Sequence, residues 1–430
     1  MKKIIVFIIG LLFFIVGCSS SNSSEKQENG GLSTPRFCGS FLQPWLSSDW
    51  DMARWEQEMN MLKNAGIQYL IYGPAWSMDL NGQLTTCYPS KLFSPSTQNE
   101  SIGKCLESAH KYGIKILLGL NFNDKWWNSK VSADWLVNQM NIGNSVADEL
   151  LSLYKSKYGD TMYGWYWVWE VDNVNWISND RQVALVNALN TNLGHLSSVS
   201  PNMPLWLSPF MNEKAGGLDA DGYKQFWINI FAQTNFRKGD VFVPQDCVGA
   251  GGLELSSVPM WFSKLKQAVD TKSGLKFWGN VETFISPYGV SAPLSRVAEQ
   301  LKAEKPYVEN FISFAYDHYN SPLIVHKDYN DSYIHYCSKG VLPLLPTPQP
   351  VESVTVSKVD DGIKISWLAD DFAEAAGYNI YRNGMLIMML QQRGGYYPKE
   401  YVDKQSSAVG SYEVSVYNAI GNESSKVENK

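Results

Sequence analysis

The stretch Met162-Tyr-Gly-Trp-Tyr-Trp-Val-Trp-Glu170 is the most informative part of this chain, because a run of apolar residues ends abruptly at a carboxylate. A second run, Leu275-Lys-Phe-Trp-Gly-Asn-Val-Glu282, ends in the same way. Both have the length and composition of a buried β-strand. In a chain of alternating strands and helices, the carboxyl ends of parallel strands gather around one mouth. We therefore expect Glu170 and Glu282 to lie on the same rim.

The same strand pattern recurs along the chain, and a stretch of helical length and mixed polarity follows each strand. Near-continuous apolar runs, such as residues 114–120, are typical of parallel strands covered by helices. Eight such units over roughly 300 residues predict an α/β fold, a (β/α)8 TIM barrel, at residues 35–341. The alternative is an open doubly wound sheet, but no glycine-rich dinucleotide fingerprint follows the first strand. The predicted strands start near Arg36, Ile67, Ile114, Met162, Pro204, Asp240, Leu275 and Glu309.

The first residues have the pattern of a targeting signal. Lys2 and Lys3 precede an apolar stretch at residues 4–16, which is too short to span a membrane. The stretch ends in Gly17-Cys18 and resembles a bacterial lipobox, in which the cysteine is lipidated. That resemblance implies a signal peptide at residues 1–17, a flexible tether at residues 18–34 and a lipoprotein of the bacterial outer membrane, facing the periplasm or the cell surface. An ordinary secretory signal is the alternative.

Composition narrows the classes of ligand. The formal net charge is −6 and no long basic run is present, which argues against nucleic acid as a partner. The six cysteines lack CxxC spacing, so we expect neither a zinc site nor another cofactor. The chain has 16 tryptophans, and several fall in predicted loops after strands, where a flat ring can stack on a sugar. For each of these tryptophans, ordinary loop packing is the alternative.

The last part of the chain has a different periodicity. Residues 342–350 form a proline-rich linker, and apolar residues then alternate with polar ones, as in half-buried strands. Asn383-Gly384 between two apolar runs indicates a tight hairpin. We expect a small all-β sandwich at residues 351–430.

This sandwich resembles a fibronectin type III module. Trp367 matches the buried tryptophan of such modules, and Gly410-Ser-Tyr412 matches their tyrosine corner. The resemblance implies that Trp367 is buried and that the Tyr412 hydroxyl bonds to nearby backbone. It also implies a spacer, or a surface that docks other glycan-utilisation proteins, rather than a catalytic domain.

The strand ends of the predicted barrel supply a neutral, hydrogen-bonding lining with few carboxylates. The lining lacks a Lys/Arg cluster for phosphate and a histidine pair for zinc, so it suits a polyol such as a carbohydrate. We predict that the lining and the loop tryptophans around it bind the substrate: Gln43, Trp45, Trp76, Asn121, Asn123, Trp126, Asp172, Gln245, Asp246, Asn280, Tyr316 and His318.

The two glutamates resemble the catalytic pair of retaining glycoside hydrolases of clan A. Those enzymes place the acid/base glutamate at the end of strand 4 and the nucleophile at the end of strand 7, the positions of Glu170 and Glu282. Residues 37–338 are also similar to the bacterial family called domain of unknown function 4434, itself assigned by resemblance to glycosidase barrels. The likeness is carried by Gly39-Ser-Phe-Leu-Gln-Pro-Trp45, Trp55 and Lys63-Asn-Ala-Gly-Ile67.

The chain also departs from the clan A pattern. Trp169 stands where an asparagine usually precedes the acid/base glutamate, and Asp246 and Tyr316 occupy the regions of a strand-6 tyrosine and a strand-8 tryptophan. The residues therefore support the barrel fold more strongly than they support a standard clan A active site.

The resemblance implies a retaining glycosidase mechanism. Ionised Glu282 attacks the anomeric carbon, and Glu170, kept protonated by desolvation and by nearby negative charge, protonates the leaving oxygen. The main alternative is a non-catalytic glycan-binding lipoprotein on a glycosidase-like barrel. An inverting hydrolase or lyase that uses Asp246 with one glutamate is a third reading. For each glutamate, a structural carboxylate bound to arginine or to backbone amides remains the alternative.

Overall fold

A computed structural model describes residues 34–128, 131–369, 375–406 and 408–429. Cys18, the predicted signal peptide and nearly all of the tether lie outside these residues, so the lipoprotein assignment stays a prediction. None of the helices in the described ranges has the length and apolar character needed to cross a bilayer.

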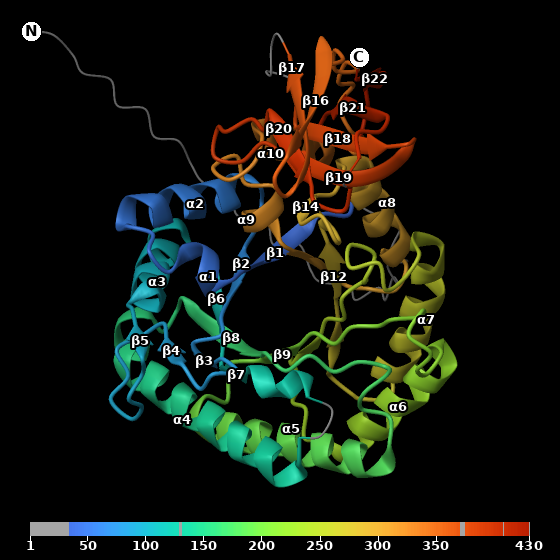
Figure 1. Cartoon of the computed structure of the whole chain (residues 1–430). Coiled ribbons are helices and arrows are strands. Elements are labelled where there is room, and N and C mark those ends of the chain that lie inside the picture. Colours follow the sequence, from blue (N-terminus) through green and yellow to red (C-terminus); the bar gives the residue numbers. More distant parts are fainter. Residues whose placement is uncertain (1–33, 129–130, 370–374, 407, 430) are drawn as a thin grey trace, which may run out of the picture. The chain divides into compact units, whose positions relative to one another are not determined.

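The central sheet is parallel and closes into a barrel (Figure 1). β11 and β12 are two halves of one strand position, separated by Trp278, and a parallel bridge between Gln245 and Asn280 completes the ring. Eight strand positions result, which confirms the predicted barrel. In neighbour order the strands are β11 (Lys276–Phe277), β10 (Val241–Phe242), β9 (Leu205–Leu207), β8 (Met162–Trp167), β6 (Lys115–Gly119), β2 (Tyr69–Tyr72), β1 (Phe37–Leu42), β15 (Phe311–Phe314) and β12 (Gly279–Glu282).

Helices surround the barrel on its outer side (Figure 1). Aspartate or serine caps several of them, as when the Asp51 side chain accepts the N–H of Arg54. Gly113 and Gly340 end two of them in the left-handed conformation, which glycine adopts without a Cβ clash. The helices are α2 (Met52–Asn64), α3 (Ser101–Tyr112), α4 (Ala133–Tyr158), α5 (Asn179–Val199), α6 (Ala220–Gln233), α7 (Val258–Val269), α8 (Leu294–Glu304) and α10 (Lys327–Lys339).

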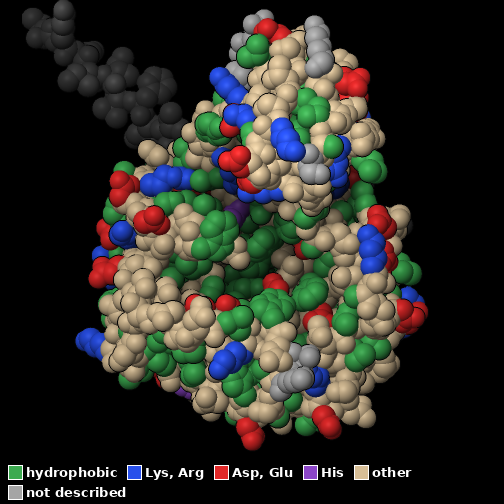
Figure 2. All heavy atoms as spheres, in the orientation of Figure 1, with side chains coloured by type: hydrophobic (Ala, Val, Ile, Leu, Met, Phe, Trp, Pro, Cys, Tyr) green, Lys and Arg blue, Asp and Glu red, His purple; other side chains and the backbone are tan. Residues whose placement is uncertain are grey.

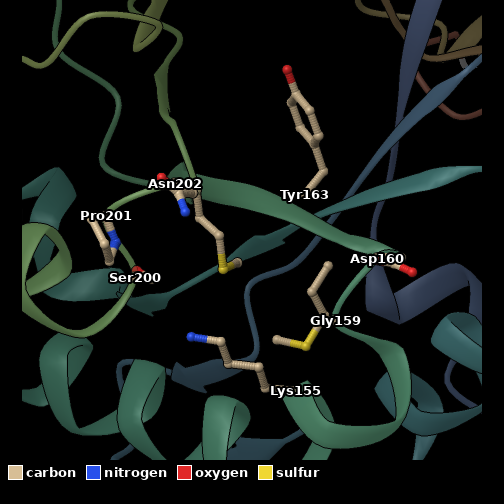
Figure 3. Close-up of a pocket in the computed structure, with 9 residues that line it drawn as sticks. Lys155, Gly159, Asp160, Tyr163, Ser200, Pro201 and Asn202 are labelled. Carbon is tan, nitrogen blue, oxygen red and sulfur yellow. The ribbon is translucent and has the colours of Figure 1, made fainter.

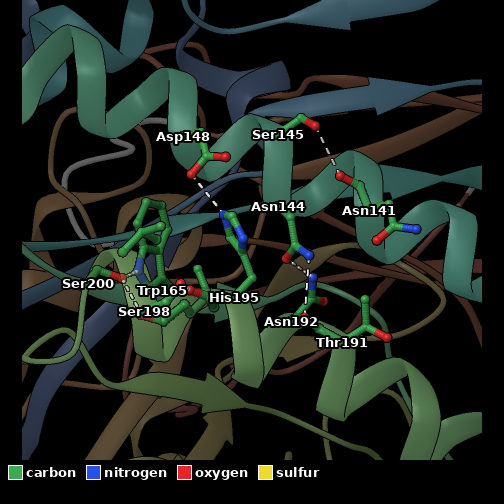
Figure 4. Close-up of polar contacts among 12 residues, drawn as sticks. Asn141, Asn144, Ser145, Asp148, Trp165, Thr191, Asn192, His195, Ser198 and Ser200 are labelled. Atoms are coloured by element: carbon green, nitrogen blue, oxygen red, sulfur yellow. Dashed lines mark hydrogen bonds and ion pairs between the residues drawn. The ribbon is translucent and has the colours of Figure 1, made fainter.

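Side chains on the two faces of β8 fill two separate cores. Tyr166 belongs to the cluster inside the barrel, whereas Trp165 and Trp167 belong to the larger cluster under the helices. The Trp167 indole N–H donates to Asn192 on α5 at 3.0 Å, which fixes its outward direction. Asn192 also bonds to Asn144 on α4, within the polar contacts that join these helices (Figure 4). This division follows from the alternation of side chains along a β-strand.

Short elements follow the carboxyl ends of the strands and build the mouth. They are too brief to leave a periodic signal in the sequence. These elements are α1 (Pro44–Ser47), β3 (Trp76–Met78), β4 (Leu84–Thr86), β5 (Thr97–Gln98), β7 (Asn121–Asn123), η1 (Asp124–Trp127), η2 (Leu255–Ser257), β13 (Phe284–Ile285), β14 (Val290–Ser291) and α9 (Tyr316–Tyr319).

The C-terminal part is an all-β structure of two antiparallel sheets, as predicted. One sheet contains β16 (Ser353–Val359), β17 (Gly362–Leu368) and β20 (Glu400–Asp403), and the other contains β19 (Met385–Gln391), β18 (Gly377–Arg382), β21 (Tyr412–Tyr417) and β22 (Val427–Glu428). Asn383 and Gly384, with φ of 49° and 78°, form the turn of the β18–β19 hairpin. Trp367 is buried in the core of these sheets.

Tyr412 shows a difference from the expected tyrosine corner. Its hydroxyl donates to the carboxylate of Asp403 at 3.0 Å, not to backbone, so that expectation is wrong. Asp403 also accepts the Arg382 guanidinium at 2.6 Å. A buried carboxylate is a stronger acceptor than a carbonyl oxygen, which explains the choice of partner. The likeness to fibronectin type III stays a prediction.

The C-terminal sheets pack directly on the barrel. Tyr417 and Ala419 belong to the same buried cluster as the barrel's outer core. The N–H of Leu294, at the start of α8, donates to the carbonyl of Ala419 at 2.9 Å. Asn418 donates to the carbonyl of Pro346 in the linker at 2.9 Å, so the linker is itself bonded to these sheets. These contacts do not fit a module that acts only as a spacer, one of the two roles that the resemblance implied.

Candidate active site

Glu282 is the last residue of β12 and lies beside Phe314, the last residue of β15. Its side chain is only 2 % exposed. One carboxylate oxygen, Oε2, accepts the backbone N–H of Ala250 at 2.6 Å. A Cβ on Gly249 would lie 2.7 Å from the Cβ of Glu282, so only glycine lets the loop after β10 approach this closely.

Three side chains form hydrogen bonds that fix the backbone of Glu282. Asp246 accepts the Glu282 N–H at 3.2 Å, and Gln300 donates both to Asp246 and, at 3.1 Å, to the Glu282 carbonyl. Arg296 donates to the same carbonyl at 3.0 Å and to that of Phe284 at 2.6 Å. Sequence reasoning missed Arg296 and Gln300. Their one signal was the spacing of four residues, which puts both on one face of α8.

Glu170 follows β8 by three residues and is half-buried. Its Oε1 accepts the side-chain amide of Gln245 at 3.1 Å. Its carbonyl accepts the indole N–H of Trp126 at 3.0 Å. Trp126 in turn stacks on Trp176 with ring centroids 4.4 Å apart, which makes the support under Glu170 rigid.

Burial raises the pKa of both glutamates. It raises the pKa of Glu170 to about 7, opposed by the Gln245 hydrogen bond and assisted by the charge of Asp172. It raises the pKa of Glu282 to about 8, assisted by the charges of Asp246 and Glu170 and opposed by the Ala250 N–H and the Arg296 charge. The charge of Glu170 makes the smallest of these contributions to the pKa of Glu282, so burial is the main reason that the two carboxyl groups keep a proton near neutral pH.

Four predicted binding residues lie at the mouth: Gln245 bonds to Glu170, and Gln43, Trp45 and His318 contact one another. Trp45 is 70 % exposed, its N–H donates to Gln43 at 2.9 Å, and its ring lies 5.1 Å from that of His318. The backbone N–H of Gln43 donates to Nε2 of His318 at 3.3 Å, so that nitrogen carries no proton. Burial and the charge of Arg393 lower the pKa of His318 to about 4, which leaves it neutral at pH 7.

Another four predicted binding side chains are directed elsewhere. Trp76 is 2 % exposed and packs in the outer core. Asn121 donates to the Gln139 carbonyl on α4, Asn123 caps η1, and Tyr316 donates to Asn330 on α10 at 2.6 Å. The structure does not bring these groups to the mouth. The expectation failed because a shift of one residue reverses the direction of a side chain in an extended segment.

The remaining four surround the glutamates as supports: Trp126, Asp172, Asp246 and Asn280. Asp172 accepts the N–H groups of Val174 and Asn175 and so fixes the turn after Glu170. Asn280 donates to Ser208 at 3.1 Å inside the barrel. All four are at most 4 % exposed, so their contacts are within the protein.

An aromatic row beside Glu282 extends the site, and the sequence prediction included only two of its members, Trp45 and His318. We define it as Trp45, Phe284, Phe314, His318 and Tyr319. Phe284 stacks on Tyr319 with centroids 5.6 Å apart, and Phe314 stacks on His318 at 6.3 Å. Figure 2 shows a hollow whose inner surface is mainly hydrophobic, with acidic groups near its edge. Phe314 and Phe284 could have been found from their places at, or just after, strand ends.

A second hollow lies at the opposite end of the barrel (Figure 3). It has a volume of about 440 Å³ and is lined by Tyr163 at the start of β8 and by residues that precede β8 and β9, including Asp160 and Asn202. It contains none of the predicted site residues. Across the described residues, no group of three or more His, Cys, Asp and Glu side chains is arranged to hold a metal ion.

The fold is a parallel (β/α)8 barrel with two buried glutamates at the carboxyl ends of its strands. The chain belongs to the family described as Domain of unknown function (DUF4434), whose model matches residues 37–325. A solved structure described as a "putative alpha-L-fucosidase" from Bacteroides thetaiotaomicron covers 74 % of this chain and 99 % of its own, with a TM-score of 0.57 and 18 % identity. This likeness shows the fold.

One curated relative is similar in sequence. It is the uncharacterized protein YbcH of Escherichia coli strain K12, 29 % identical over 141 residues. The match covers 33 % of this chain and 46 % of YbcH, so the chain spans about half the length of that relative.

Proposed function

We propose that the protein is a retaining glycoside hydrolase that cleaves a poly- or oligosaccharide through Glu170 and Glu282. The observation that carries the proposal is the pair itself. Two glutamates from the ends of β8 and β12 are desolvated, and each is held by its own hydrogen-bond donor. Paired carboxyl groups whose ionisation is coupled are the groups that glycosidic cleavage requires.

The hydrogen bonds distinguish the two roles. The Ala250 N–H and the positive charge of Arg296 both favour the ionised form of Glu282, which suits a nucleophile. Oε1 of Glu282 has no hydrogen-bond donor among the described residues, so it is the oxygen free to attack. Glu170 accepts only the neutral amide of Gln245, and Asp172 adds negative charge nearby, which suits the proton donor.

The reaction then needs one proton in the pair. Two interacting carboxyl groups lose their protons in two steps that belong to the pair, so the singly protonated form is the active one. The higher pKa of Glu282, about 8 against about 7 for Glu170, places that proton mainly on Glu282 in the empty site, so the reaction proceeds from the less populated form with the proton on Glu170. Glu282 forms a bond to the anomeric carbon while Glu170 gives its proton to the leaving oxygen. Water then breaks the glycosyl ester, and Glu170 accepts the proton of that water.

The alternative functions require different features of the site. A non-catalytic glycan-binding protein needs Trp45 and the aromatic row but gains nothing from two desolvated carboxyl groups. An inverting enzyme that uses Asp246 needs room for water beside it. Asp246 is fully buried, and both its oxygens accept hydrogen bonds from Val248, Glu282 and Gln300, which disfavours that role. Lipidation of Cys18 and location at the outer membrane remain part of the proposal.

The experiment is a screen of the purified protein against a panel of polysaccharides and aryl glycosides. We expect at least one substrate to be hydrolysed by the wild type and by Glu254→Gln, a control at an exposed glutamate paired with Lys214. Glu282→Gln should have no turnover because an amide is not an adequate nucleophile. If Glu282→Gln hydrolyses the substrate as fast as the wild type does, the assignment is wrong.

A further inference from the structure

Besides Tyr417 and Ala419, the C-terminal sheets contact the barrel through the loop Gln392-Arg-Gly-Gly-Tyr-Tyr397, here named the 392–397 loop. Gly394 and Gly395 have φ of 55° and 80°, so the loop makes a turn that glycine adopts readily. The N–H of Gly394 donates to the carbonyl of Ile324 at 2.9 Å, and Arg393 forms an antiparallel bridge with Val325. The loop is thereby fixed to the segment between α9 and α10.

The same region contacts the β13–β14 hairpin, which follows Glu282. Gln391, just before the loop, accepts the N–H of Ser291 on β14. The Arg393 guanidinium donates to the carbonyl of Gly289, at the turn of the hairpin, at 2.8 Å. Ser291 also donates to the Tyr319 carbonyl at 2.7 Å. The hairpin is therefore held between the C-terminal sheets and α9.

The Arg393 guanidinium is exposed beside the mouth. Its charge acts on His318 and Tyr319 of the aromatic row, and the charge of Glu282 also acts on Tyr319. In the described part of the chain, no Asp or Glu lies within ion-pair distance of Arg393, whereas Arg382 is paired with Asp403. A guanidinium has five N–H donors, and the bond to Gly289 uses one of them.

A guanidinium with unused N–H donors has a defined preference for ligands. It binds planar or tetrahedral oxyanions through two parallel N–H bonds. His318 cannot provide the positive charge, because the donor from Gln43 keeps its Nε2 unprotonated. Tyr396, in the same loop, is 67 % exposed and adds another aromatic face.

We propose that Arg393 is a specificity-determining residue of the mouth and binds the carboxylate or sulfate group of an acidic glycan. The C-terminal sheets then complete the substrate-binding site instead of acting as a spacer. This inference rests on the proposed function, because it takes the mouth around Glu170 and Glu282 to be the place where the glycan binds.

The test compares anionic with neutral glycans in affinity gel electrophoresis. The anionic probes are polygalacturonate, alginate, chondroitin sulfate and carrageenan, and the neutral probes are galactan, dextran and mannan. Arg393→Gln is the informative variant, since glutamine can still donate to the Gly289 carbonyl but has no charge. Lys358→Gln removes one charge from the other sheet, at an exposed position on β16, and is the matched control.

We expect the wild type and Lys358→Gln to be retarded by at least one anionic probe. Arg393→Gln should bind that probe about 10- to 100-fold more weakly, the range for a charged hydrogen bond of about 1.5–3 kcal/mol. Arg393→Lys should lie between them. Binding by the wild type should also weaken as sodium chloride rises from about 50 to about 500 mM, because salt screens exposed charges.

Three results overturn the inference: retardation by neutral probes alone, unchanged affinity in Arg393→Gln, or wild-type affinity for the anionic probes that salt does not alter. The salt series needs no variant, so it decides the matter even if Arg393→Gln fails to fold. Hydrolysis of a neutral glycan at the same rate by wild type and Arg393→Gln would remove this inference and leave the glycoside hydrolase standing. Salt-sensitive binding of an acidic glycan without turnover would support the role of Arg393 in binding and argue against the glycoside hydrolase.

Discussion

Replacing Glu282 with glutamine should stabilise the protein as the pH rises. Glutamine has nearly the same shape and can still accept the Ala250 N–H, but it cannot ionise. The pKa of Glu282 lies at about 8 in the folded protein, against an ordinary value of 4.5. At a side chain only 2 % exposed, desolvation of the charged form is the largest cause of this shift, and the charge of Asp246 adds to it.

The sign and size follow from proton linkage. Below pH 4.5 the carboxyl is protonated in both states, so it adds no difference between wild type and variant. Between pH 4.5 and 8 the unfolded chain releases the proton and the folded chain keeps it, so wild-type stability falls with pH. The shift of about 3.5 units, from 4.5 to about 8, corresponds to about 5 kcal/mol at about 1.36 kcal/mol per unit. Relaxation around the charge reduces this figure, and we expect about 2–5 kcal/mol.

The assay is urea unfolding followed by tryptophan fluorescence at about pH 5 and about pH 8.5. Wild type, Glu282→Gln and the exposed control Glu254→Gln are measured in parallel. The free energy of unfolding of Glu282→Gln, relative to wild type, should rise between the two pH values, while that of Glu254→Gln should not. A difference that stays constant with pH, or that falls, would refute the reasoning that Glu282 is a desolvated carboxyl group with a raised pKa.

Three further predictions use other parts of the structure. The pH dependence of kcat/KM should be a narrow bell, rising near pH 7 as the pair loses its first proton and falling near pH 8 as it loses the second; a plateau from pH 5 to 9 in initial-rate measurements would contradict it. Trp126→Ala should lower the free energy of unfolding by about 3–5 kcal/mol and kcat with it, because the contacts with Glu170 and Trp176 are lost; Trp126→Phe, which keeps the ring but not the N–H, should restore stability more than kcat. Removing residues 351–430 should lower Tm by at least about 5 °C in calorimetry, since Tyr417 leaves the shared core; an unchanged Tm would restore the spacer interpretation.

The barrel was predictable because its signals are local. Strands such as Lys115–Gly119 are apolar along their whole length, and helices such as Val258–Val269 bury one face, so both periods can be read from the residues. The same reasoning placed Glu170 and Glu282 at the carboxyl ends of their strands. It depended only on where each apolar run stops.

The lining of the mouth was predicted less well, because side-chain direction in short segments depends on a single residue of register. Asn121 and Tyr316 follow strands directly, yet both are directed towards the outer helices. Phe284 and Phe314 reach the mouth instead, although their apolar character suggested core. Sequence periodicity does not resolve an offset of one residue in elements of three or four.

Contacts between distant segments could not be predicted at all. Arg393 lies 111 positions after Glu282 in the sequence, in a loop that reads as a simple turn between two strands. Its bond to Gly289 exists only because two separately predicted parts of the chain share a core. The hydrogen bond from Tyr412 to Asp403 could not be predicted either. The sequence shows the donor but not which acceptor the fold brings near it.

The central claim is that Glu170 and Glu282 act as acid/base and nucleophile, and chemical rescue tests it most directly. Glu170→Ala is assayed with an aryl glycoside that the wild type hydrolyses, with and without sodium azide, and the product is examined by NMR. We expect a slow variant that azide accelerates, because the azide anion needs no base and fits the space left by the side chain. The product should be a glycosyl azide with the anomeric configuration of the substrate. An azide product of inverted configuration, or a rate that azide leaves unchanged, would contradict these roles.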